Sequence, residues 1–184
     1  MRFVKSLKLH FNLKWGVDCL PKHPKSPSSV KYKARVGYEG EYYLVQKFIS
    51  AGDGFYAVRT PGSGTGKMAK PDIIATDNGE LLAIEVKSTR KKYVMLNQDQ
   101  VNRLLEFCRR FMVKCPRCGV EIKAKPILAV RFLNRGWKFI EVPGDWRGSI
   151  IVRVDEASPK LLQSSPSHSD VEAGSPSPKK KALK

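Results

Sequence analysis

The segment that most constrains the fold is an apolar hairpin near the middle of the chain. Its two apolar runs, Asp72–Thr76 and Glu80–Lys87, flank the dipeptide Asn78-Gly79. Because both residues of an Asn-Gly pair tolerate positive φ, this dipeptide is a strong signal for a tight β-hairpin turn. The sequence therefore predicts two antiparallel strands that belong to a buried sheet.

Three charged residues interrupt this hairpin. Side chains alternate between the two faces of a strand, so Glu85 and Lys87 point the same way while Val86 points into the core. Asp72 lies on the antiparallel partner strand and reaches Glu85 if the register is favourable. Two carboxylates, with water and phosphate oxygens, make a site that suits Mg²⁺ or Mn²⁺. The alternative is a surface ion pair between Glu85 and Lys87 at a frayed strand end, which is a common and weak interaction.

Further helices and strands surround the hairpin. Apolar stripes with helical spacing predict helices over Arg35–Ala51 and Gln98–Met112. Short runs of strand-forming residues predict strands at Phe55–Thr60, Pro126–Phe132 and Trp137–Val142. The order helix, three strands, helix, two strands predicts an α/β fold with a central mixed β-sheet flanked by helices.

The two ends of the chain differ in composition from the middle. Residues 1–34 are interpreted as a basic N-terminal arm and linker, in which Leu7–Trp15 alternates strictly and favours a half-buried strand. Residues 155–184 are dominated by Ser, Pro and Lys, a composition typical of a disordered tail. This leaves residues 35–154 as the folded domain.

Charge indicates the kind of partner. The formal net charge is +17, and the residues before Gly37 and the segment from Gly37 to Val154 share the excess about equally. A polyanion is the expected partner, nucleic acid before membrane. No apolar stretch approaches the ~18–20 residues of a transmembrane helix, so no membrane partner is expected. Four cysteines do not suggest a disulfide scaffold, and we expect a cytoplasmic protein. The basic N-terminus leaves a transit peptide as an alternative.

The charged hairpin matches the PD-(D/E)xK nuclease pattern, and the chain from Val36 to Val142 resembles the archaeal-type Holliday junction resolvases. The matching blocks, in order, are GYEGEYYLVQKF, VRTPGSG, KPDIIA followed by IEVKS, and YVMLNQDQVNRLLEF. The resemblance implies a restriction-endonuclease-like core. It also implies a homodimer that cleaves four-way DNA junctions by Mg²⁺-dependent phosphodiester hydrolysis.

The resemblance also assigns roles to individual residues. The implied catalytic residues are Glu41, Asp72, Glu85, Lys87 and Ser63. Asp72 and Glu85 would hold the metal with the Val86 carbonyl, and Glu41 would join directly or through water. Lys87 would position the attacking water. The implied DNA contacts come from Arg59, Lys67, Lys70 and Gln100.

Two other functions remain open from the residues alone. One is another nuclease on the same core, acting on duplex, flap or single-stranded DNA. The other is a non-catalytic junction-binding module, against which the full set Glu41, Asp72, Glu85 and Lys87 argues.

Two further motifs have weaker meanings. The segment CPRCG contains Cys115 and Cys118, which supply two of the four ligands that structural zinc prefers. Cys108 is a candidate third ligand, and a plain thiol pair or a disulfide is the alternative. The Gly-rich GSGTGK lacks the Ser or Thr that a P-loop needs after its lysine, since Met68 follows Lys67. No nucleotide cofactor is therefore expected.

Overall fold

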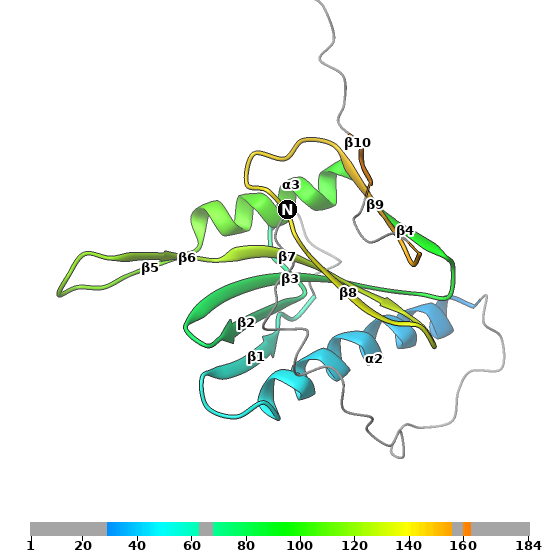
Figure 1. The fold of residues 1–184 in the computed structure, drawn as a ribbon, viewed down its shortest axis with the longest axis horizontal. Coiled ribbons are helices and arrows are strands. Elements are labelled where there is room, and N and C mark those ends of the chain that lie inside the picture. Colours follow the sequence, from blue (N-terminus) through cyan, green and yellow to red (C-terminus); the bar gives the residue numbers. More distant parts are fainter. Residues whose placement is uncertain (1–28, 63–67, 156–159, 163–184) are drawn as a thin grey trace, which may run out of the picture.

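A computed structural model describes residues 29–62, 68–155 and 160–162, and its centre is a five-stranded mixed sheet (Figure 1). The strands lie in the order β1 (Phe55–Arg59), β2 (Ile73–Asp77), β3 (Glu80–Thr89), β7 (Lys125–Phe132) and β8 (Gly136–Glu141). Strands β3 and β7 run parallel, and the other neighbours run antiparallel. The predicted α/β class with a central mixed sheet flanked by helices is confirmed.

The predicted hairpin forms strands β2 and β3. Asp77 pairs with Glu80, and the two residues between them, Asn78 and Gly79, have φ values of 48° and 89°. Positive φ at both central residues is what an Asn-Gly turn permits at little cost. The turn thereby fixes the register that the hairpin's apolar residues require.

One helix covers each face of the central sheet. Helix α2 (Val30–Ile49) packs Leu44 and Phe48 against a core that includes Ile84 and Val86 of β3. Helix α3 (Gln98–Arg110) contributes to a second core on the opposite face, which includes Ala83 of β3. Strand β3 therefore supplies both cores through the alternation of its side chains. Figure 1 shows the two helices on either side of the sheet.

A smaller three-stranded sheet extends the α3 side. Its order is β10 (Lys160–Leu162), β9 (Ser149–Arg153) and β4 (Tyr93–Leu96). Leu96, Ile150 and Val152 are buried in the same core as α3. Strand β9 was not predicted, and β10 lies inside the tail that was predicted to be disordered. That prediction is wrong for Lys160–Leu162, which pair with β9.

A two-stranded hairpin projects from the body of the molecule beyond α3 (Figure 1). It consists of β5 (Met112–Lys114) and β6 (Glu121–Lys123), which were not predicted. The predicted helix continued to Met112. Helix α3 ends instead at Arg110, because Phe111 adopts an extended backbone that starts the hairpin.

The start of α2 differs from its predicted position. The predicted linker to residue 34 is helical from Val30, since the Ser29 hydroxyl accepts a hydrogen bond from the Tyr32 N–H at 3.1 Å and caps the helix. The predicted strand at Leu7–Trp15 lies outside the described residues. Within residues 29–62, 68–155 and 160–162, no helix has the length and apolarity to cross a membrane.

Candidate active site

A cavity of about 360 Å³ opens where β3 runs beyond β2. Strand β2 pairs only with Glu80–Ile84 of β3, whereas Glu85–Thr89 pair with β7 on the other side alone. From Glu85 to Thr89, the backbone edge of β3 that faces away from β7 therefore has no partner in β2. The charged and polar residues that line the cavity are Glu41 of α2, Lys70 and Asp72 before β2, Glu85, Lys87 and Ser88 of β3, and Gln100 and Arg103 of α3.

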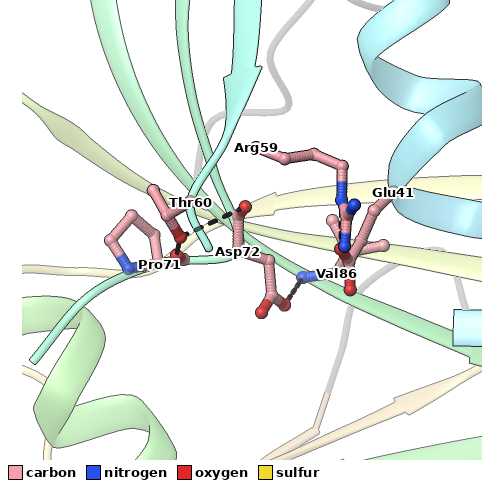
Figure 2. A network of polar contacts seen from close by, with 6 residues as sticks. All are labelled: Glu41, Arg59, Thr60, Pro71, Asp72 and Val86. Carbon is pink, nitrogen blue, oxygen red and sulfur yellow. Dashed lines mark hydrogen bonds and ion pairs between the residues drawn. The ribbon is translucent and has the colours of Figure 1, made fainter. Parts of the chain in front are cut away.

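Asp72 uses the unpaired edge of β3. Its Oδ2 accepts a hydrogen bond from the Val86 N–H at 2.8 Å, and its own N–H donates to the Ile84 carbonyl at 3.1 Å. The Thr60 hydroxyl donates to the Pro71 carbonyl and fixes the backbone just before Asp72 (Figure 2). In a strand the N–H and C=O of one residue point to the same edge, so the Val86 carbonyl faces the same side as Asp72.

Glu85 and Lys87 lie on the face of β3 that carries α3. The Lys87 Nζ lies 2.6 Å from Glu85 Oε1. Burial raises the pKa of the Glu85 carboxyl above its ordinary value, and the nearby charge of Asp72 raises it further, while Lys87 and Arg103 oppose the shift. The register that pairs Ile73 with Ile84 brings Asp72 next to Glu85 across the two strands, and both residues line the cavity.

Glu41 reaches the cavity from α2 and is held by an arginine. The Nε and Nη2 of Arg59 both lie 2.7 Å from Glu41 Oε2, and the Arg59 guanidinium lies 4.5 Å from the centre of the Tyr38 ring (Figure 2 shows the Glu41–Arg59 pair). Burial raises the pKa of the Glu41 carboxyl, the hydrogen bond from Arg59 lowers it, and the charge of Asp72 raises it again. Glu39 pairs instead with Arg35 at 2.8 Å, so Glu41 is the helix glutamate at the cavity.

Two of the remaining predicted DNA contacts, Lys70 and Gln100, have hydrogen-bond partners within the protein. The Lys70 Nζ donates to the Pro61 carbonyl at 2.8 Å. Gln100 closes a capping box with Asn97 at the start of α3, in which the Gln100 N–H donates to Asn97 Oδ1 at 2.9 Å. Ser63 and Lys67 lie outside the described residues.

Arg103 also lines the cavity and was not predicted from the sequence. It follows Gln100 by three positions, so the two side chains share one face of α3. That spacing was available as a signal once Gln100 was assigned to the site. Gly37 of α2 and Ser88 of β3 also line the cavity and were not predicted.

The carboxylates fit a hard divalent cation by chemistry and electrostatics. In the described ranges, no three His, Cys, Asp or Glu side chains converge into a ready-made metal cluster, and Glu41 is engaged by Arg59. Glu41, Asp72 and Glu85 nevertheless line one cavity, and the charge of Asp72 raises the pKa of both glutamates. A divalent cation would relieve this repulsion, and carboxylate and carbonyl oxygens are ligands that Mg²⁺ and Mn²⁺ prefer.

The predicted three-cysteine zinc set is not formed. Cys108 is buried in the core beside α3, and burial raises the pKa of its thiol to about 12. Cys115 and Cys118 lie at the tip of the β5–β6 hairpin, and all three thiols are free. Cys108 therefore belongs to the apolar stripe of α3 that packs into the core. Of these three cysteines, Cys115 and Cys118 remain candidate metal ligands.

Comparison with known proteins gives consistent matches. The family model described as "Archaeal holliday junction resolvase (hjc)" matches residues 32–162. The chain is 37% identical over 125 residues to the crossover junction endodeoxyribonuclease Hje of Saccharolobus solfataricus, covering 67% of this chain and 83% of that protein. It is 47% identical over 73 residues to a crossover junction endodeoxyribonuclease of Sulfolobus islandicus rod-shaped virus 1, covering 39% of this chain and 60% of the viral protein.

A solved structure of the Holliday junction resolvase Hjc from Archaeoglobus fulgidus is 32% identical to this chain with a TM-score of 0.45, covering 55% of this chain and 72% of that one. The family match extends over well more than half of the chain and includes every described cavity residue. The chain belongs to the archaeal Holliday junction resolvase family.

Proposed function

We propose that this protein is a crossover junction endodeoxyribonuclease that cuts four-way DNA junctions by metal-dependent hydrolysis of a phosphodiester. The observation that supports the proposal is the convergence of Glu41, Asp72, Glu85 and Lys87 on one cavity. Glu41 lies on α2, Asp72 directly precedes β2, and Glu85 and Lys87 lie on β3. The rigid core therefore holds all four in place.

The metal would be held by Asp72, Glu85 and the Val86 carbonyl, with Glu41 joining directly or through water. Mg²⁺ or Mn²⁺ would supply a Lewis acid that neutralises charge on the scissile phosphate. The Val86 N–H fixes Asp72 by its 2.8 Å hydrogen bond. Glu85 fixes the Lys87 ammonium at 2.6 Å.

From that position Lys87 would donate to the attacking water and orient it toward phosphorus. Arg59, which balances Glu41 at the cavity, would meet the DNA backbone together with Lys70. We assign Ser63 to the water or the scissile phosphate, and Lys67 and Gln100 to DNA, on the resemblance of the motifs.

The substrate would be recognised by phosphate contacts and by junction shape. A net charge of +17 favours an electrostatic, salt-sensitive interaction. Resolving a junction requires paired cuts in opposed strands, and a two-fold homodimer would supply two equivalent sites. We therefore propose a homodimer as the active form.

The decisive experiment compares a four-way junction with linear duplexes of the same arm sequences, with Mg²⁺, with Mn²⁺ and with chelator. We expect cutting of the junction only, and only with metal. Asp72→Asn and Glu85→Gln should bind the junction and fail to cut it. Glu106→Gln, which changes a half-buried glutamate of α3 that pairs with Arg110 and does not line the cavity, is the matched control and should cut normally.

The other outcomes distinguish the remaining functions. Equal cutting of linear duplex would assign a general nuclease on the same core. Tight junction binding without cutting in either metal would assign a binding module. Full cutting by both Asp72→Asn and Glu85→Gln would overturn the assigned site.

The homodimer has its own test. Wild-type chains mixed with an excess of Asp72→Asn chains should form mixed dimers that cut one of the two strands. On a supercoiled cruciform plasmid, the product should shift from linear to nicked circles. An unchanged ratio of linear to nicked product would contradict the two-site dimer.

A further inference from the structure

The tip of the β5–β6 hairpin holds two thiols in a defined turn. The Cys115 N–H donates to the Val120 carbonyl at 2.9 Å, and the Gly119 N–H donates to the Cys115 carbonyl at 2.9 Å. Gly119 has a φ of 70°, a conformation that favours glycine. The turn thus brings Cys118 back toward Cys115, and neither thiol is buried.

Both thiols of the turn are accessible to a metal ion, since Cys118 is exposed and Cys115 is half-buried. The thiolate is the form of cysteine that binds metal. The turn therefore presents Cys115 and Cys118 together at the tip of the hairpin as two candidate ligands.

We infer that Cys115 and Cys118 form one half of a tetrathiolate Zn²⁺ site, and that the same two cysteines of a second copy of this chain form the other half. Structural zinc prefers four ligands, and a Cys-x-x-Cys turn provides two of them. Among the described residues, no further His, Cys, Asp or Glu side chain joins the pair to make a group of three. A second copy supplies the missing thiolates by symmetry.

The hairpin surface beside the thiols also suits a second copy. Val113 pairs directly with Ile122, and alternation places Val120 on the same face as Ile122. These three side chains are 52%, 44% and 57% exposed. Two such hairpins related by a two-fold axis would cover each other's apolar face. The patch is far smaller than the ~1,200 Å² of a stable interface, so the contact should depend on the metal.

The charges near the tip favour the same site. Four thiolates around Zn²⁺ carry a net charge of about −2. Lys114 and Arg117 lie beside the two thiols in the chain, and the Lys114 Nζ lies 3.8 Å from Glu121 Oε1. These basic side chains would offset the charge of the cluster. Without the cluster, the positive charge of Lys114 and Arg117 opposes contact between two hairpin tips.

The test measures metal content and mass of the full-length chain. We expect one Zn²⁺ for every two chains. Titration with Co²⁺ should give a thiolate-to-metal charge-transfer band with the intensity of four thiolates per metal. Chelation should lower the mass of the assembly, and added Zn²⁺ should restore it.

Matched cysteine variants test whether the zinc binds at the hairpin tip or elsewhere in the chain. Cys115→Ser with Cys118→Ser should lose the bound zinc and the zinc-dependent increase in mass. Cys108→Ala should keep both, because that thiol is buried beside α3. Circular dichroism should show that all variants are folded, and none of these cysteines lines the cavity of the nuclease site.

A crosslinking experiment tests the contact between two hairpin tips even if the chains also associate through another surface. In a Cys19→Ser, Cys118→Ser background, mild oxidation should link Cys115 of one chain to Cys115 of another if the two tips meet. One zinc per chain, or no zinc together with a Cys115–Cys118 disulfide, would overturn the inference. Either result leaves the proposed junction cleavage unaffected.

Discussion

The two halves of strand β3 have the same backbone conformation and opposite chemistry. In the first half, which pairs with β2 from Glu80 to Ile84, residues 82–84 also pair with β7 and carry fully buried apolar side chains such as Leu82 and Ile84. Glu85–Thr89 have lost β2 as a neighbour and carry Glu85 and Lys87 into a cavity. The difference teaches that a single missing strand partner creates the site, because it gives Asp72 a backbone N–H to bind and admits solvent at the same edge.

The largest effect on cutting should come from Lys87, which lies in the half of β3 without a β2 partner (the unpaired half, Glu85–Thr89). We expect Lys87→Ala to reduce the single-turnover rate of junction cutting by about 10²–10⁴-fold, the range for loss of a residue that positions or transfers a proton. Its stability should change little, because the side chain faces the cavity. Lys91→Ala, which changes an exposed lysine just beyond β3, is the control and should keep the rate within a few-fold.

A substitution in the paired half should act on stability instead. Ile84 is fully buried, and Ile84→Ala should lower the free energy of unfolding by about 2–5 kcal/mol. Urea denaturation measures this loss. If Ile84→Ala lowered the free energy of unfolding by less than Lys87→Ala does, the division of β3 into a structural and a chemical half would be wrong.

The next effect concerns how closely α2 approaches the unpaired half. A Cβ on Gly40 would lie 2.2 Å from the Ser88 hydroxyl, whereas a Cβ on Gly37 would meet nothing within 4 Å. Gly40→Ala should therefore destabilise by about 1–3 kcal/mol through overpacking. Gly37→Ala, one turn away on the same helix, should stabilise by up to about 1 kcal/mol. Equal thermal shifts for the two variants would contradict the close approach.

The smallest expected effect is a pH-dependent gain from Glu85→Gln. Because the folded-state pKa of Glu85 is raised above its ordinary value of 4.5, the stability it contributes in acid is lost as pH rises through the folded pKa. The variant should therefore be more stable than wild type at neutral pH and lose this advantage below about pH 4.5. Thermal melts at several pH values measure the difference, and Glu106→Gln should show almost none of it.

The hairpin and its charges could be predicted because their signals are local. Asn78-Gly79 fixes the turn, and alternation then places Glu85 and Lys87 on one face and Val86 on the other. The position of Glu41 came from the family resemblance, and the cavity contains it. These residues were found because short motifs determine them.

The features that were missed depend on contacts between distant segments. Strand β9 forms because Leu96 and Ile150 meet across β4 and β9 in a core that neither segment reveals alone. The pairing of Arg59 with Glu41 joins a strand to a helix and requires the tertiary structure. The start of α2, by contrast, could have been predicted, because Ser29 is a favourable N-cap residue and caps the helix. The prolines that precede it led to the prediction of a linker instead.

The parallel pairing of β3 with β7 has a consequence for how the enzyme is made. Leu82 pairs with Lys125, and all of α3 and the β5–β6 hairpin lie between them in the chain. Among the described strands, β7 is the one that pairs with the half of β3 that carries Glu85 and Lys87. Closing so long a loop is a slow step in folding. During synthesis, a chain that has emerged only as far as α3 lacks the strand that supports Glu85 and Lys87, so the proposed cutting activity should appear only after β7 leaves the ribosome.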